Sequence, residues 1–531
     1  MGTPGARPNF VGRDDLLRVS ASDAQRLPNG CGMYGALKVR PDLKTTDWSR
    51  RYDNSQPFVL GIIREIAIKL HGDPRTETWE ELDTALQIEL SQYNLHPGIL
   101  SYARPAIENY LDCHEAVEAE IGRLRLRTYD PTVIAGASTN RLTVWAPIYD
   151  SHSGVREVRR LRFGKARQPG EEPDQWTVVA AYVASLVRPI GDLERIRVIE
   201  FGLEDGSAEV LFDATPQEAA SNYNSLTLPK LHKIVDARNA TPGYSCKECK
   251  IAGCCGSLQR LDGFLGQPTP GPATRSVSAR DIEVYEVCAA KWLLEMSSLP
   301  TQKNSGPSSQ RGINIHRWLA MAHMRSTRCT PESVDSLEES LGAPLTNDEH
   351  SEARDYLLGH TKTCPLGDGV QIIASEYPVY GYDAQADVII ASKPDMAYID
   401  SDGTFVIRET KTTTREIPES EKDAFDKYLA VPWLLNLFAS GYRGPHQSDK
   451  ARLELEVLSP EGSRVFSWDA DNARLLRMAK AEVRLRARAW HKDTTWSATP
   501  GAHCSWCTVK KWCPDARSAD AEVGVESELS I

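Results

Sequence analysis

The sequence lacks three features, and each absence excludes a class of protein. No run of apolar residues approaches the roughly 20 that a membrane-spanning helix needs. The first residues, MGTPGARPNFVGRDD, lack the apolar core of a secretory signal. Positive charge is not in excess, since the formal net charge is −11. We therefore expect a cytoplasmic protein that uses no membrane and has no general basic coat, although a local basic groove for nucleic acid stays compatible with this charge.

The rest of the composition is that of a soluble globular protein. The chain has 531 residues, of which 41% are hydrophobic and 25% are charged. This length is sufficient for two or more domains, each with a sizeable core.

Cysteine is the residue whose placement is most informative. In each half one cysteine stands alone and is followed much later by a C-x2-C-x5-C cluster. These residues are Cys31 with Cys246, Cys249 and Cys255 in the first half, and Cys288 with Cys504, Cys507 and Cys513 in the second. The lone cysteine precedes its cluster by 215 residues in the first half and by 216 in the second. The repetition of both spacings predicts a tandem duplication.

Clustered cysteines in a reducing cytoplasm more often hold metal than form disulfides. Four thiolates split one-plus-three across a domain suit a metal centre that ties its two ends together. C-x2-C pairs occur in both zinc and iron–sulfur sites, so the spacing alone leaves both open. Cys254 is an alternative to Cys255 as a ligand. We interpret the remaining cysteines as small buried hydrophobic residues; they are Cys113, Cys329 and Cys364.

The Gly- and Pro-rich composition of residues 263–274 predicts a linker. It divides the chain into a first domain at residues 1–262 and a second at residues 275–517, and the acidic stretch at 518–531 is expected to be a disordered tail. Each half begins with a Ser-capped helical pattern near its lone cysteine and continues with helices and then strands. The expected helices include residues 58–70 and 313–324, and the expected strands include 140–149, 155–163, 371–382, 386–391, 395–399 and 403–411. This order predicts an α/β protein of two tandem domains, each a mixed β-sheet flanked by helices with a helical insertion.

The second half has a motif with catalytic chemistry. Asp395 follows a proline, and after a spacer of thirteen residues come Glu409 and Lys411 as Glu-x-Lys. On a strand Glu409 and Lys411 share a face, and Asp395 on the neighbouring strand can lie beside Glu409. Carboxylate oxygens of this kind suit Mg²⁺ or Mn²⁺. The metal would activate a water, and Lys411 would orient that water or stabilise developing charge.

The alternatives at this site are nearby residues of the same type. Asp387 competes with Asp395, and Glu376 lies one strand earlier, where we expect a surface carboxylate. His316, which follows Gly312 in a G-x3-H pattern, is a further candidate ligand, and His323 on the same helical stretch competes with it.

The second half resembles the iron–sulfur members of the RecB-like PD-(D/E)XK nucleases, which include AddB-type repair proteins and CRISPR adaptation nucleases. Six elements occur in the order that this family shows: a Ser-x-Ser helix with a lone cysteine, Gly312-x3-His316, Pro-Asp, Glu-x-Lys, a tyrosine-bearing helix and a final three-cysteine cluster. The sequence departs from the family at Tyr428, because Ala424 stands where its Gln-x3-Tyr motif has glutamine.

The resemblance implies metal-dependent cleavage of DNA, on single strands or ends, in DNA repair, recombination or antiviral defence. By the same resemblance His316, Asp395 and Glu409 hold Mg²⁺ or Mn²⁺, and Lys411 is the catalytic lysine. The eight patterned cysteines would hold two 4Fe–4S clusters, with zinc as the alternative. DNA is the implied partner, together with a helicase or another complex subunit. The rival hypothesis is a non-catalytic iron–sulfur scaffold or DNA-binding subunit.

The first half has lost this chemistry. When the two turns are laid over each other, Trp145 takes the place of Asp395 and Arg160 that of Glu409, and a shifted register brings in Lys165 instead. Glu65 stands in the place of His316. We interpret this half as an inactive nuclease-like domain that kept its cysteine cluster and that contacts DNA through residues 156–167 or docks a partner.

Overall fold

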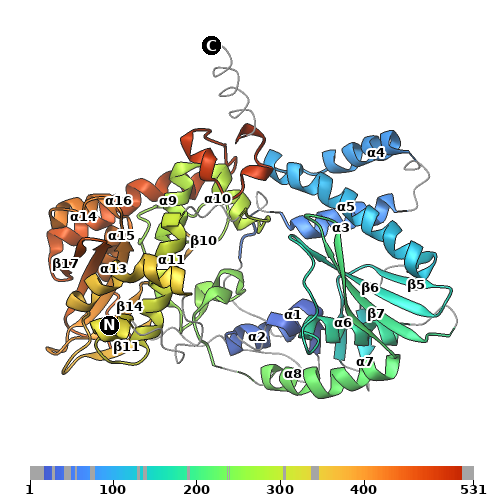
Figure 1. Cartoon of the computed structure of the whole chain (residues 1–531), viewed down its shortest axis with the longest axis horizontal. Coiled ribbons are helices and arrows are strands. Elements are labelled where there is room, and N and C mark those ends of the chain that lie inside the picture. The colour runs from blue at the N-terminus through green and yellow to red at the C-terminus, as the bar shows by residue number, and fades with distance from the viewer. Residues whose placement is uncertain are drawn as a thin grey trace, which may run out of the picture.

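The computed structural model describes residues 17–26, 30–40, 50–53, 57–71, 78–127, 132–135, 140–187, 192–235, 237, 239–302, 307–335 and 346–516. The expected tail at residues 518–531 lies outside these ranges. The described chain forms two lobes, one built mainly from the first half and one from the second (Figure 1). Within the described residues, none of the helices combines the length and the apolar character needed to cross a bilayer.

The central sheet of the second half has five strands in the order β11-β14-β15-β16-β17. Only β15 and β16 run parallel, and the other neighbours are antiparallel. The strands are β11 (Gln371–Ser375), β14 (Met396–Ile399), β15 (Phe405–Thr412), β16 (Ala451–Ser459) and β17 (Gly462–Asp469). A parallel pair inside an antiparallel sheet makes this a mixed sheet.

The central sheet of the first half has the same order and the same directions. Its strands follow the order β2-β5-β6-β7-β8, and only β6 and β7 are parallel. They are β2 (Leu124–Leu126), β5 (Ile148–Ser151), β6 (Val155–Arg162), β7 (Arg195–Gly202) and β8 (Ser207–Ala214).

Each half also has a smaller sheet with matching directions. In the first half β1 is parallel to β4, which is antiparallel to β3, and in the second β10 is parallel to β13, which is antiparallel to β12. The strands are β1 (Leu17–Ser20), β3 (Thr132–Ala135), β4 (Asn140–Thr143), β9 (Gln259–Arg260), β10 (Arg275–Val277), β12 (Val379–Asp383) and β13 (Val388–Ser392). The predicted α/β class, with mixed sheets flanked by helices, is confirmed.

Helices cover these sheets and carry the caps that the sequence predicts. Those of the first half are α1 (Ala21–Arg26), α2 (Gly32–Val39), α3 (Val59–Leu70), α4 (Trp79–Ser91), α5 (Pro97–Ile121), α6 (Gln175–Leu186), α7 (Pro216–Asn222) and α8 (Leu228–Val235). Those of the second are α9 (Ala279–Val287), α10 (Ala289–Met296), α11 (Pro307–His323), α12 (Pro331–Asp335), α13 (Asn347–Thr363), α14 (Glu421–Lys427), α15 (Ala430–Ala439) and α16 (Ala473–Lys492). Ser278 caps α9 by accepting from the Asp281 amide, in a reciprocal capping box.

Two of the predicted strands are wrong in extent. Residues 371–382 form β11 and β12, and residues 140–149 form β4 and β5, and in each case the two strands belong to different sheets. Glu376 lies between β11 and β12 with a φ of 53°, a left-handed conformation that ends a strand. Periodicity alone does not show such a break.

The Gly- and Pro-rich segment is buried at both of its ends, while its middle, Pro268 to Pro270 and Pro272, is exposed. Phe264 and Leu265 are fully buried, and Asp383 accepts hydrogen bonds from the amides of Gly263 and Leu265. β9, just before this segment, pairs with β12 of the second half. The chain between the halves is therefore part of the core that joins them.

Candidate active site and cysteine-lined sites

Strand β15 places Glu409 and Lys411 on one face, because side chains alternate along a strand. The Lys411 ammonium donates to Oε1 of Glu409 at 2.6 Å. The Glu409 side chain is 14% exposed and that of Lys411 is 34% exposed. The Glu-x-Lys pair thus forms a partly open ion pair at the centre of the sheet.

Asp395 connects this strand to helix α11. Its Oδ1 lies 2.6 Å from Nδ1 of His316, and its Oδ2 accepts from the backbone amide of Thr410 at 2.7 Å. Thr410 is the residue between Glu409 and Lys411, so these two bonds bring His316, Asp395 and the Glu-x-Lys strand to one place. All four predicted catalytic residues lie in this region.

Burial and neighbouring charges shift the pKa values of three residues in this site. Burial disfavours the imidazolium form of His316, but the Asp395 carboxylate outweighs burial and raises the pKa of His316. Burial, together with the negative charge of Asp395, raises the pKa of Glu409 against the opposing effect of Lys411. For Lys411, burial is outweighed by the Glu409 carboxylate, and the pKa is raised. Two carboxylates in a confined space favour a bound cation.

A cleft lies beside the Glu409–Lys411 ion pair, and further basic side chains line it. It is lined by Glu409 and Lys411 from β15, by Ser278, Arg280 and Glu283 at the start of α9, and by Lys393, Trp433 and Leu434. Arg280 is exposed, and Lys393 forms an ion pair with Glu376. Basic side chains at the rim suit a phosphodiester backbone.

The donor set of this site fits a hard divalent ion, since it offers two carboxylates and an imidazole. Ligand atoms of His316, Asp395 and Glu409 do not all lie within 4.8 Å of one another; among the residues that the structure describes, only a different group of side chains meets that distance. Oε1 of Glu409 accepts from the Lys411 ammonium, so a bound ion would compete with Lys411 for this carboxylate.

The competing residues have other contacts. Asp387 is buried and accepts from Arg51, Thr274 and Tyr382, so it joins the two halves. Glu376 is a surface carboxylate, as expected. His323 faces His360, away from Asp395. Tyr428 caps the end of α14, and Ala424 is fully buried.

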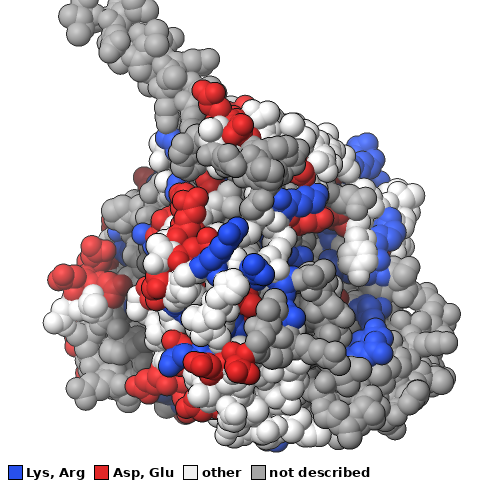
Figure 2. Space-filling view, turned by 90° about the vertical axis from the view of Figure 1, so that its right-hand side faces the viewer, with Lys and Arg blue, Asp and Glu red and all other residues white. Residues whose placement is uncertain are grey.

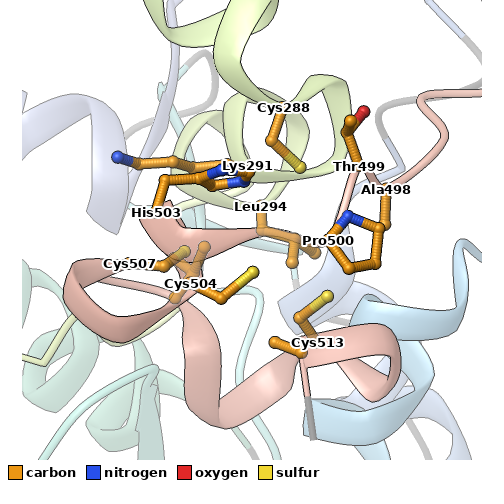
Figure 3. A pocket seen from close by; sticks show the side chains of 12 residues that line it. Cys288, Lys291, Leu294, Ala498, Thr499, Pro500, His503, Cys504, Cys507 and Cys513 are labelled. Atoms are coloured by element: carbon orange, nitrogen blue, oxygen red, sulfur yellow. The ribbon is translucent and has the colours of Figure 1, made fainter. Parts of the chain in front are cut away.

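The four patterned cysteines of the second half line one cavity (Figure 3). Cys288 lies at the junction of α9 and α10, and the other three lie on two short 3₁₀ turns near the C-terminal end, so residues more than 200 positions apart face one space. Burial raises the pKa of Cys507, and the positive charge of Lys291, which lines the cavity from α10, partly opposes this shift.

The four thiols of this cavity suit either a zinc ion or a 4Fe–4S cluster, since cysteine thiolates bind both.

The first-half cysteines show the same arrangement. Cys31 occupies the N-cap position of α2, as Cys288 occupies that of α10. Burial raises the pKa of Cys246 to about 11 and that of Cys249 to about 12, and in both cases the charges of Cys255 and Cys31 add to the effect. Cys246 and Cys249 belong to one buried cluster, and Cys31 and Cys255 pack against it.

The hairpin register identifies the first-half counterparts of the site. The pair next to each turn is Ile399 with Phe405 in one half and Asp150 with Arg156 in the other. Counting four residues along each strand places Arg160 at the position of Glu409, as the turn glycines predict. The same register places Ala146 at the position of Asp395, so the alignment with Trp145 is wrong by one residue. Strand pairing, not turn composition, sets this register.

Arg160 is internally paired, with Asp174 at 2.7 Å and Glu200 at 3.2 Å. Arg156 and Arg159 are fully buried and pair with Asp150 and Glu157. The hypothesis that residues 156–167 contact DNA as a basic strip is therefore wrong for these two arginines. On the face of this half in Figure 2, basic and acidic side chains are interspersed.

The sequence did not predict one group of four neighbouring histidine and cysteine side chains. Cys329 and Cys364, interpreted as buried hydrophobic residues, are indeed buried but lie beside His323 and His360. The signal that would have found them is the pairing of His-x5-Cys with His-x3-Cys, at residues 323–329 and 360–364.

Comparison with known proteins gives the class of the second half. Residues 276–514 match the family model described as the PD-(D/E)XK nuclease superfamily, so this part of the chain is a domain of that superfamily. A solved structure described as "Crystal structure of SSO0001" is 13% identical with a TM-score of 0.20, covering 45% of this chain and 86% of that one. No curated protein matches.

Proposed function

We propose that the protein is a metal-dependent DNA nuclease whose active site is built from His316, Asp395, Glu409 and Lys411. The observation that carries the proposal is that Asp395 contacts both His316 and the backbone of the Glu-x-Lys strand, inside a superfamily domain of nucleases. A bound Mg²⁺ or Mn²⁺ would polarise the phosphate and lower the pKa of a water.

The residues of the chain have separate tasks in this scheme. Asp395 and Glu409 would supply negative oxygen ligands to the ion, and His316, whose Nδ1 lies 2.6 Å from Oδ1 of Asp395, would supply a ring nitrogen. Lys411 is held beside Glu409 and can stabilise negative charge that develops on the phosphate oxygens. Arg280 and Lys393 at the rim of the cleft position the strand through its phosphates. DNA, on single strands or ends, is the substrate that we propose, in repair, recombination or antiviral defence.

We further propose that the two halves are tandem copies, with the active domain at residues 275–517 and an inactive one at residues 1–262, each closed by a 4Fe–4S cluster. The equal strand orders support the duplication, and the Arg160–Ala146 pair in place of Glu409–Asp395 supports the loss of activity. The inactive half would serve to bind DNA or a partner such as a helicase.

The test is a cleavage assay on chain purified without oxygen. End-labelled single-stranded DNA, double-stranded DNA and RNA of equal length are incubated with Mg²⁺, with Mn²⁺, and with EDTA. We expect cleavage of DNA with either metal and none with EDTA. Intact substrate in every reaction would favour the non-catalytic scaffold.

A further inference from the structure

A second group of metal-binding side chains lies on the opposite face of the sheet from Glu409 and Lys411. His323 ends helix α11, Cys329 follows it in the next loop, and His360 and Cys364 stand at the end of α13. All four are buried, and one ligand atom from each lies within 4.8 Å of all the others. Two imidazoles and two thiols at these separations can share one metal ion.

The two histidines are placed as ligands of one ion. Nε2 of His323 lies 3.1 Å from Nε2 of His360. In a tetrahedral zinc site with Zn–N of about 2.0 Å, the two nitrogens lie about 3.3 Å apart. The observed separation is thus close to that of two imidazoles that share a zinc ion.

A carboxylate fixes the tautomer that metal binding needs. Nδ1 of His360 is 2.9 and 3.0 Å from the two oxygens of Glu456, so it donates its proton there. In the neutral ring this leaves the lone pair of Nε2 directed at His323. A carboxylate behind the far nitrogen of a histidine is the usual support of a zinc ligand.

We propose that His323, Cys329, His360 and Cys364 bind a structural zinc ion. Two imidazoles and two thiolates form a common structural zinc set, and four protein ligands leave no open position for substrate. This centre is separate from the two four-cysteine sites and from the nuclease site.

The zinc ion would hold the nuclease site in shape. His316 is on the same helix as His323, two turns earlier, so fixing the end of α11 also fixes the helix that meets Asp395. Glu456 also accepts from the Thr410 hydroxyl, and the Thr410 amide donates to Asp395. Binding energy at the zinc would thereby become folding energy for this part of the domain.

The test uses the full chain, purified without oxygen so that iron sites stay filled. Zinc and iron are counted by mass spectrometry, and the zinc ligands are identified by X-ray absorption. We expect about one zinc per chain, with two sulfur neighbours at about 2.3 Å and two nitrogen neighbours at about 2.0 Å. Absence of zinc, or a spectrum with four sulfurs and no nitrogen, would overturn the proposal.

Three variants assign the zinc to these residues. Cys364→Ser should lose the zinc, whereas Cys507→Ser, which removes a ligand of the four-cysteine site, should keep it. Cys113→Ser is the matched control, since Cys113 is a buried cysteine that donates to the Gly206 carbonyl. Retention of zinc by Cys364→Ser, or its loss from Cys507→Ser, would place the ion elsewhere. If Cys364→Ser does not fold, the absorption spectrum of the unmodified chain still decides the ligand set.

Discussion

Nδ1 of His316 lies 2.6 Å from Oδ1 of Asp395, although 79 residues separate them in the chain. The contact joins helix α11 to the beginning of β14, and the second oxygen of Asp395 holds the backbone of β15. One carboxylate therefore sets the relative positions of a helix and two strands. This arrangement explains why a Pro-Asp motif can act together with a Glu-x-Lys motif.

Asp395→Asn should weaken Mn²⁺ binding at least about tenfold, the lower end of what loss of even an outer-shell partner costs a metal site. The amide keeps the shape of the side chain but removes the negative charge. Titration calorimetry on chain stripped of divalent ions measures the affinity.

Glu376→Gln is the matched control for that change. Glu376 is a surface carboxylate near Asp395 in the chain fold, and its amide donates to the Asp395 carbonyl. We expect unchanged Mn²⁺ affinity in this variant. Equal affinities in Asp395→Asn and in the unmodified chain would remove Asp395 from the metal site.

Lys411→Ala should slow DNA cleavage about 10²–10³-fold, the usual cost of removing one group that stabilises transition-state charge. Mn²⁺ binding should persist, because Lys411 is a cation and competes for Glu409 rather than binding the metal. Cleavage rates and calorimetry on the same sample separate the two effects.

Lys422→Ala serves as its control, since Lys422 is exposed and pairs only with its helix neighbour Asp426 in the contacts described. Its cleavage rate should match that of the unmodified chain. If Lys411→Ala lost Mn²⁺ binding together with activity, a structural role would replace the catalytic one.

The sequence predicted the parts of this site that depend on local order. The alternation of a strand places Glu409 with Lys411, and the chain order of the motifs led to Asp395 and His316. It did not predict which residue of the first half faces Arg160, because that depends on the register of β5 against β6. Nor did it find His323, Cys329, His360 and Cys364, which come together only when α11 and α13 pack.

Burial decided a further difference between prediction and structure. The sequence predicted that Arg156 and Arg159 belong to an exposed basic strip, but both are buried beside carboxylates. A lone sequence cannot show that Asp150 and Glu157 compensate them. The segment at residues 263–274 differs from its prediction for a similar reason, because Phe264 and Leu265 enter the core although the prolines that follow them are exposed.

Cys255→Ser should lower the iron content from about eight atoms per chain to about four, because one of two 4Fe–4S clusters loses a ligand. Cys254→Ser should keep all eight. Iron analysis with absorbance near roughly 400 nm, the region of iron–thiolate bands, measures both. A loss of iron in Cys254→Ser with full retention in Cys255→Ser would reverse the assignment of the ligand.

His114 should make the first half sensitive to acid. Burial, with the nearby charge of Arg159, lowers the pKa of His114 to about 2. The folded chain therefore keeps this ring neutral, while the unfolded chain protonates it below a pKa of about 6.5. As the pH falls below that value, the unfolded state binds more protons, and the free energy of unfolding decreases by about 1.4 kcal/mol per pH unit.

Urea unfolding at pH 7 and at pH 5 measures this effect. His114→Phe should lose less stability between the two values than the unmodified chain, and His446→Phe, which removes an exposed histidine, should lose as much. The same pH dependence in His114→Phe and the unmodified chain would assign acid sensitivity to other groups.

The most direct test of the central claim is the single-turnover rate at which Glu409→Gln cleaves end-labelled single-stranded DNA in Mn²⁺. We predict that the unmodified chain cleaves and that the variant does not, with equal iron content and equal circular dichroism. Cleavage by Glu409→Gln at the unmodified rate would contradict a nuclease site on strand β15.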